Sequence, residues 1–130
     1  ELIKRLHEFD LVINTLPGSA VNFVSEEFFN AMKNGAVYAN IGRGATTDET
    51  ALVQAIDTGK LSAAVLDVTE TEPIPADSKL WNHENIILTQ HNGGGVFNEA
   101  EAKTALFLEN IARQEKNLPL KNLIDLNKGY

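Results

Sequence analysis

The sequence predicts an α/β fold built around a parallel β-sheet. Short apolar runs alternate along the chain with longer segments that have helical periodicity. The apolar runs are nearly continuous, which is typical of strands that are buried on both faces of a parallel sheet. Turn residues, mainly glycine and proline, separate the segments. The pattern therefore indicates one β–α series in a single domain.

Four strands are expected, and a short amphipathic helical segment through Leu2, Ile3, Leu6 and Phe9 precedes them. The expected strands cover residues 11–16, 36–41, 62–68 and 85–89.

The first helix after a strand has clear end signals. Ser25 is a good N-cap residue, and Val24 and Phe29 occupy the two positions of a hydrophobic staple. Gly35 is expected to end this helix in a left-handed conformation.

Two further helices are expected. One covers residues 49–58 and ends at Gly59. The other begins with a capping box formed by Asn98 and Glu101 and reaches Lys116. Residues 117–130 form a tail in which apolar residues alternate without a helical period.

Composition narrows the class of protein. The 130 residues are 43 % hydrophobic and 22 % charged, as in a soluble globular domain. A net charge of −7 with scattered basic residues argues against nucleic-acid binding. The chain has no cysteine, no signal peptide and no apolar run near the roughly 20 residues of a membrane span. We therefore expect a cytoplasmic protein. Because the chain starts at Glu1 within a helical pattern, we expect it to be a fragment of a larger protein.

Polar residues follow each expected strand, where open α/β sheets bind their ligands. They are Pro17, Gly18 and Ser19 after the first strand, Gly42, Arg43 and Gly44 after the second, Asp67, Glu70 and Glu72 after the third, and His91 and Gly93 to Gly95 after the fourth. Arg43, Glu72 and His91 are thus expected to converge on one rim of the sheet.

These three residue types together suit one chemistry. An arginine can bind a carboxylate with two hydrogen bonds, and a histidine can exchange a proton near neutral pH. A nearby carboxylate favours the charged imidazole. The set would suit reduction of a 2-oxo acid: Arg43 holds the carboxylate, His91 protonates the carbonyl oxygen, and hydride arrives from a cofactor. The three histidines have no metal-ligand spacing, so no metal site is expected.

Each residue also has a simpler interpretation. Arg43 lies between two glycines and is equally consistent with an exposed loop residue. Glu72 lies in an acidic run that is more often a solvated loop. His91 beside three glycines is more suggestive, because glycine lets a ligand approach the backbone closely. Residues 42–47 match the dinucleotide-binding fingerprint only in part, since Thr47 replaces the third glycine, and we do not assign them to a pyrophosphate.

Taken in order, the motifs resemble those of the D-isomer-specific 2-hydroxyacid dehydrogenases over nearly the whole chain. The matching segments are DLVINTLP (10–17), MKNGA (32–36), NIGRG (40–44), DE (48–49), GKL (59–61), LDV (66–68), ETEP (70–73), LW (80–81), Asn85 and TQHNGG (89–94).

The resemblance implies a fold, an activity and residue roles. The fold would be the second half of a Rossmann-like doubly wound parallel sheet with three layers, α/β/α, from an NAD-binding domain. The parent protein would interconvert a D-2-hydroxy acid and a 2-oxo acid, with NAD as the default cofactor and NADP not excluded. Arg43 would bind the substrate, His91 would be the acid/base, and Glu72 would keep His91 protonated. The cofactor would be lined by Leu16, Pro17, Ile41, Gly42, Arg43, Asp67, His91, Gly93 and Gly94, with Asp67 at the nicotinamide carboxamide.

The chain also departs from the family pattern. Gln90 replaces the proline that usually precedes the catalytic histidine, and Asn92 replaces an apolar residue. The glycine-rich turn, the residue that selects NAD over NADP and the substrate-binding domain are expected upstream of Glu1, and 117–130 is expected to return toward that domain. The isolated chain should therefore be inactive, and the parent should be a homodimer that binds neither nucleic acid nor a membrane. A nucleotide-sensing corepressor on the same scaffold is the alternative.

Overall fold

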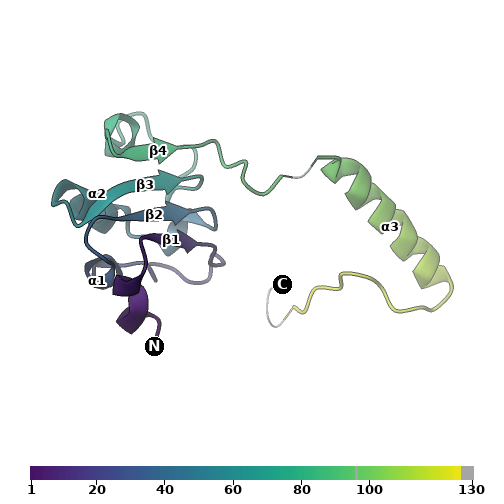
Figure 1. The fold of residues 1–130 in the computed structure, drawn as a ribbon. Coiled ribbons are helices and arrows are strands. Elements are labelled where there is room, and N and C mark those ends of the chain that lie inside the picture. The colour runs from purple at the N-terminus through teal and green to yellow at the C-terminus, as the bar shows by residue number, and fades with distance from the viewer. Residues whose placement is uncertain (96, 127–130) are drawn as a thin grey trace. The chain divides into compact units, whose positions relative to one another are not determined.

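The computed structural model describes residues 1–95 and 97–126, and it divides the chain into two compact units (Figure 1). The first unit comprises Glu1–Gly94 and the second comprises Gly95–Tyr130. The described part of the expected tail, residues 117–126, lies in the second unit, and residues 127–130 lie outside the described residues.

The first unit contains one sheet of four parallel strands. They are β1 (Leu11–Asn14), β2 (Ala36–Asn40), β3 (Leu61–Leu66) and β4 (Ile86–Leu88), and they are hydrogen-bonded in sequence order. This confirms the predicted α/β fold with a parallel sheet, and each strand lies within or one residue outside its predicted range.

Helices connect the strands and lie on one face of the sheet. The α-helices are α1 (Glu26–Ala31) and α2 (Glu49–Asp57). Right-handed crossovers between strands that progress in one direction place successive helices on the same face, as Figure 1 shows. Three short 3₁₀ helices complete the unit: η1 (Ile3–Glu8), η2 (Gly44–Thr46) and η3 (Lys79–Asn82).

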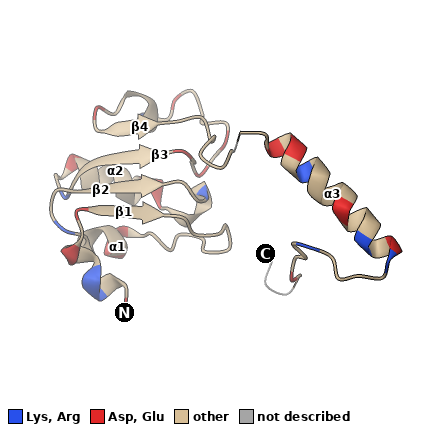
Figure 2. Ribbon diagram, turned by 45° about the vertical axis from the view of Figure 1, so that its right-hand side comes forward, with Lys and Arg blue, Asp and Glu red and all other residues tan. Residues whose placement is uncertain are grey.

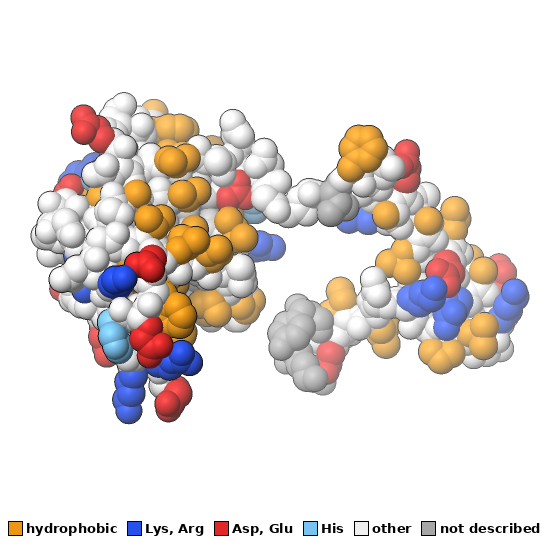
Figure 3. Space-filling view, in the orientation of Figure 1, with side chains coloured by type: hydrophobic (Ala, Val, Ile, Leu, Met, Phe, Trp, Pro, Cys, Tyr) orange, Lys and Arg blue, Asp and Glu red, His pale blue; other side chains and the backbone are white. Residues whose placement is uncertain are grey.

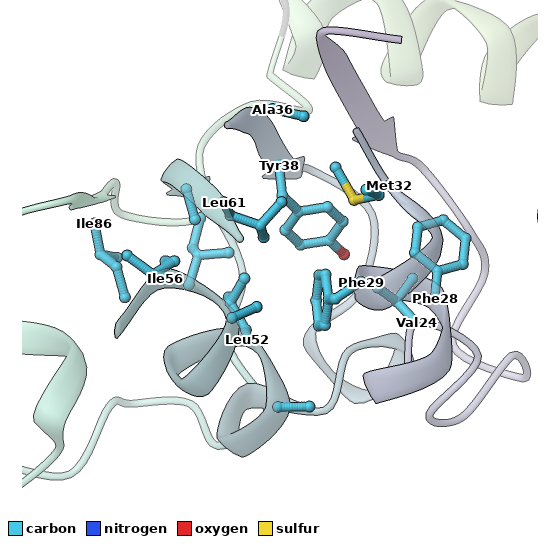
Figure 4. Packing of buried hydrophobic residues seen from close by; sticks show 14 of the residues in the cluster. Val24, Phe28, Phe29, Met32, Ala36, Tyr38, Leu52, Ile56, Leu61 and Ile86 are labelled. Atoms are coloured by element: carbon cyan, nitrogen blue, oxygen red, sulfur yellow. The ribbon is translucent and has the colours of Figure 1, made fainter. Parts of the chain in front are cut away.

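The core lies between the sheet and this helical layer (Figure 4). Phe29 and Tyr38 pack edge to face with ring centroids 5.2 Å apart, and Phe28 packs edge to face on Phe29. Leu52 of α2 is fully buried in the same cluster. Asp48 is the N-cap residue of α2, and its side chain accepts a hydrogen bond from the Ala51 N–H (2.9 Å).

The opposite face of the sheet remains apolar and exposed. Leu11, Ile13 and Ile87 are each about half exposed, and Figure 3 shows hydrophobic side chains gathered on this side. The second helical layer of the expected α/β/α arrangement is therefore not formed by residues 1–94.

Two details of the first helix differ from the prediction. Helix α1 ends at Ala31 because Met32 has an extended backbone, so Gly35 follows a short turn instead of capping the helix. Gly35 is left-handed as predicted, with a φ of 77°, and its N–H donates to the carbonyl of Lys60, the residue directly before β3. Ser25 is the N-cap residue, but its side chain makes no capping hydrogen bond.

The second unit consists of α3 (Glu99–Glu115) and the segment that follows it. The predicted capping box is wrong: Asn98 has a left-handed backbone, φ 66°, and its side chain makes no capping hydrogen bond. An N-cap side chain reaches the helix only from an extended backbone, which Asn98 lacks.

Charged residues are distributed along α3 (Figure 2). The Asn110 side chain binds both backbone groups of Lys121: its Oδ1 accepts the Lys121 N–H (2.9 Å), and its Nδ2 donates to the Lys121 carbonyl (3.1 Å). No helix in the described residues has the length and hydrophobicity needed to cross a bilayer.

Candidate active site

The loops after the strands surround a cavity of about 230 Å³ at the carboxyl edge of the sheet. The structure brings Arg43, Glu72 and His91 together on the wall of this cavity, although Arg43 and His91 are 48 positions apart in the sequence. The cavity is lined by Gly18, Arg43, Gly44, Ala45, Thr69, Glu70, Glu72 and His91.

Glu72 and His91 form a direct pair. Nδ1 of His91 lies 2.7 Å from Oε2 of Glu72, and Oε1 of Glu72 accepts the Thr69 N–H at 3.0 Å. The hydrogen bond from the Thr69 N–H is the largest effect on the pKa of Glu72 and lowers it. Burial raises this pKa, and His91 and the Arg43 charge lower it further, so that the net shift is downward. Glu72 is therefore a carboxylate at neutral pH. Because a carboxylate only accepts hydrogen bonds, Nδ1 carries a proton, and Nε2 is the nitrogen left for chemistry.

The backbone that carries His91 is held in an unusual conformation. His91 has a φ of 53°, in the left-handed region that side chains other than glycine seldom adopt. Asp67, at the end of β3, fixes the residues that follow: its Oδ1 accepts the Asn92 N–H (3.1 Å) and its Oδ2 accepts the Gly93 N–H (2.7 Å). The Thr89 hydroxyl also donates to Asp67 and is the largest cause that lowers the pKa of this carboxylate.

Arg43 projects from a tightly packed loop. Its Nη1 donates to the Gly42 carbonyl at 2.7 Å. The neighbouring Gly44 lies against the next loop so closely that a Cβ there would be 1.8 Å from the Thr69 carbonyl oxygen. This contact joins the Arg43 loop to the loop that holds Glu72. It also gives Gly44 a role in packing, and our rejection of residues 42–47 as a pyrophosphate loop stays a prediction.

The predicted cofactor-lining residues fall into two groups. Leu16 and Gly42 are in direct contact, because a Cβ on Gly42 would lie 2.8 Å from the Leu16 carbonyl oxygen. Pro17 and Ile41 are exposed beside them. The second group is the His91 loop: a Cβ on Gly93 would lie 2.8 Å from Oδ2 of Asp67, whereas Gly94 has open space around it.

These residues fit the nicotinamide end of a dinucleotide. The exposed Pro17 and Ile41 offer apolar surface next to the cavity that holds Arg43 and His91. Asp67 accepts three hydrogen bonds from the protein, and a carboxylate has about four acceptor positions, so one remains for an amide donor.

A second cavity of about 510 Å³ adjoins the acid–base pair. It shares Glu72 and His91 with the first cavity and has an apolar side formed by Pro73, Ile74, Trp81 and Leu88. In the described residues, no three His, Cys, Asp or Glu side chains gather in a way that could hold a metal ion.

A buried polar network that was not predicted from the sequence lies below the site. Its members are Asn14, Tyr38, Asn40, Thr46 and Thr47. Thr69 and Thr89, which bind the two carboxylates, were not predicted either. The available signal was the presence of asparagine at the ends of two otherwise apolar strands.

Comparisons with known proteins show the family of the chain. Residues 1–93 match the family described as D-isomer specific 2-hydroxyacid dehydrogenase, NAD binding domain. The chain is 35 % identical over 132 aligned residues to glyoxylate/hydroxypyruvate reductase A of Salmonella newport strain SL254. The match covers all of this chain and 42 % of that relative.

Solved structures with the same fold include two that contain cofactors. A D-isomer specific 2-hydroxyacid dehydrogenase from Xanthobacter autotrophicus Py2, in complex with NADPH and MES, has a TM-score of 0.88 and 31 % identity, covering 99 % of this chain and 53 % of that one. A probable 2-hydroxyacid dehydrogenase from Rhizobium etli CFN 42, with NADP, HEPES and L(+)-tartaric acid, has a TM-score of 0.86 and 34 % identity, covering 99 % and 42 %. The chain thus spans about two fifths of the length of the curated relative that it matches.

Proposed function

Because this chain belongs to the D-isomer specific 2-hydroxyacid dehydrogenases, we propose that it supplies the acid–base side of an active site that interconverts 2-oxo acids and D-2-hydroxy acids. The observation that carries the proposal is the Glu72–His91 pair, 2.7 Å apart, on a cavity that Arg43 also lines.

Arg43 binds the acid. Its guanidinium is a planar fork of donors that suits a carboxylate, and Arg43 lines the cavity. Because Nη1 uses one of its N–H groups to donate to the Gly42 carbonyl, the remaining donors are left for a ligand. In this role Arg43 holds the substrate carboxylate and draws electron density from the adjacent carbonyl.

His91 moves the proton. Ionised Glu72 fixes the proton on Nδ1 and stabilises the imidazolium, so Nε2 donates to the carbonyl oxygen during reduction and accepts a proton from the hydroxyl during oxidation. Positioned acid–base groups of this kind typically contribute about 10²–10⁴-fold to the rate.

The cofactor in this proposal is a nicotinamide dinucleotide, which when bound supplies or accepts the hydride. Leu16, Pro17, Ile41, Gly42, Gly93 and Gly94 would line it. The remaining acceptor position of Asp67 would receive the carboxamide N–H. The two solved relatives described above hold NADPH and NADP, so both NADP(H) and the expected NAD(H) are to be tested.

We propose that the chain acts as part of a larger homodimeric enzyme, with glyoxylate and hydroxypyruvate as the first substrates to test. The relative from Salmonella is a glyoxylate/hydroxypyruvate reductase of which the chain covers 42 %. The isolated chain of 130 residues should not turn over any 2-oxo acid. The corepressor alternative has no support among the relatives described above, which are reductases and dehydrogenases.

The test measures oxidation of NADH and of NADPH by glyoxylate, hydroxypyruvate and pyruvate in the protein that contains this chain. Arg43→Lys should raise KM for the acid, because an ammonium cannot make the two-pronged contact. Arg5→Lys is the matched control, since Arg5 is exposed and its ion pair is with Glu8 of the same 3₁₀ helix. Absence of turnover with every 2-oxo acid, or an unchanged KM in Arg43→Lys, would contradict the proposal.

A further inference from the structure

We propose that Asn14, Asn40 and Thr46 are positioning residues that set the direction of Arg43. The inference rests on the proposed function, because it assigns these residues a part in binding the acid substrate. None of the three lines the cavity that holds Arg43. All three are buried, with exposures of 5 %, 0 % and 0 %.

The two asparagines occupy equivalent positions. Asn14 ends β1, Asn40 ends β2, and the two are partners in the strand register. Each accepts a hydrogen bond from the backbone two residues later: Oδ1 of Asn14 from the Leu16 N–H (2.9 Å) and Oδ1 of Asn40 from the Gly42 N–H (3.0 Å). Each side chain therefore fixes the first turn of the loop after its own strand.

This use of Oδ1 also fixes where the amide nitrogens point. Because backbone N–H groups require an acceptor, each asparagine must direct its Nδ2 into the protein. Nδ2 of Asn14 donates to Oγ1 of Thr46 at 2.7 Å. Nδ2 of Asn40 donates to the Arg43 carbonyl at 3.2 Å. The Thr46 hydroxyl donates to the same Arg43 carbonyl at 2.6 Å.

Arg43 is thus held by its backbone from two strands. Its carbonyl accepts one hydrogen bond from the Asn40 side chain and another from the Thr46 hydroxyl, which in turn accepts a hydrogen bond from Asn14. The guanidinium is held through a second route, because Nη1 donates to the Gly42 carbonyl while Asn40 holds the Gly42 N–H. An exposed arginine would otherwise sample many directions, so this network is what limits the guanidinium to one side of the cavity.

The network is closed on its inner side. Tyr38 and Thr47 share a hydrogen bond of 2.6 Å, and Nδ2 of Asn14 and Nδ2 of Asn40 donate to Tyr38 and Thr47 respectively. Burial raises the pKa of Tyr38, so its hydroxyl stays protonated. Among the described residues no buried side-chain nitrogen or oxygen lacks a partner. A fully satisfied polar network of this kind is rigid, and removal of one hydroxyl leaves other members unpaired.

Thr46 allows a test with matched variants. Thr46→Val removes the hydroxyl with almost no change of shape, and Thr46→Ser keeps it. Ile56→Val is the control for a small change in the same core, away from the site. In the protein that contains this chain, we expect Thr46→Val to lower kcat/KM for the 2-oxo acid by about 10- to 100-fold, chiefly through KM, because small misplacements of a binding group have effects of this size. Thr46→Ser should restore it, and the activity of Ile56→Val should stay unchanged.

A second readout does not depend on turnover. Amide hydrogen exchange followed by NMR should show protected Leu16 and Gly42 N–H groups in the wild type, because both are bonded to buried asparagines. In Asn40→Ala the Gly42 amide should lose protection while Leu16 keeps it.

The two readouts separate the two claims. If the wild type reduces no 2-oxo acid, the proposed function fails, and amide exchange still decides whether the network holds the loops. If the wild type is active but Thr46→Val retains its KM, or Thr46→Ser loses as much as Thr46→Val, the positioning role is overturned. Unprotected Leu16 and Gly42 amides in the wild type would also overturn it.

Discussion

The contact between Gly44 and the Thr69 carbonyl makes the sharpest stability prediction for this fold, through the change Gly44→Ala. The added Cβ would lie 1.8 Å from the carbonyl oxygen and 2.0 Å from the carbonyl carbon of Thr69, and 2.6 Å from the Glu70 nitrogen. All three are backbone atoms, so no side chain can rotate away. The two loops that carry Arg43 and Glu72 would have to separate.

The cost can be set from the geometry. Overpacking in a core typically costs about 1–3 kcal/mol when side chains can adjust, and a clash with backbone belongs at the upper end, about 3 kcal/mol. One kcal/mol shifts the melting temperature of a domain of 60–100 residues by about 4–8 °C. For the unit Glu1–Gly94 we therefore expect a fall of about 12–24 °C.

Thermal melts followed by circular dichroism measure this shift. Gly18→Ala is the matched control on the same edge of the sheet, because a Cβ there would have an ordinary contact of 3.7 Å with the Arg43 side chain. That control should lie within about 0.5 kcal/mol of the wild type. A Gly44→Ala melt that matches the control would refute the close approach of the two loops.

Three further predictions concern single residues. The pKa of Asp67 is lowered in the fold, so the stability that the Asp67 carboxylate contributes is complete above its ordinary pKa of 3.8 and is lost as the pH falls below that value. The melting temperature of Asp67→Asn should therefore lie below that of the wild type at pH 7. The difference between the two melting temperatures should close toward pH 3. Glu72→Gln removes the charge beside His91, so the rate at which this variant reduces a 2-oxo acid should fall by about 10- to 100-fold, most strongly at high pH. If the rates of the variant and of the wild type changed with pH in the same way, the Glu72–His91 pair would have no part in the proton transfer. Leu52→Ala should lower the free energy of unfolding by about 2–5 kcal/mol in urea titrations, because Leu52 is fully buried. Leu2→Ala, at a half-exposed position, should change it by less than about 0.5 kcal/mol, and equal effects would contradict the assigned core.

The strand pattern was predictable because buried parallel strands need nearly continuous apolar runs. β3 illustrates this, since only Ser62 interrupts its apolar residues. Helix ends were harder to predict. The end of α1 is set by the extended backbone of Met32, and Asn98 is left-handed, and neither conformation follows from residue type alone.

Convergence of Arg43, Glu72 and His91 was predictable from topology, because the carboxyl ends of neighbouring parallel strands share one edge. Their roles came from the resemblance and stay predictions. The part of Asp67 in holding the His91 loop was not predictable, since it depends on backbone N–H groups that carry no sequence signal.

The supporting network could have been suspected from one signal. Asn14 and Asn40 end strands that are otherwise apolar, and a buried amide requires partners. Which partners they have, and that the two asparagines face each other in register, required the folded chain.

Turnover of the His91→Gln variant, in the protein that contains this chain, decides whether His91 is the acid–base group of a 2-oxo acid reductase. The assay is NADH and NADPH oxidation by glyoxylate and hydroxypyruvate. The control is His7→Gln, at an exposed histidine that is distant from His91 in the sequence. We expect kcat to fall by about 10²–10⁴-fold in His91→Gln and to stay unchanged in His7→Gln. Full activity in His91→Gln would contradict this role of His91.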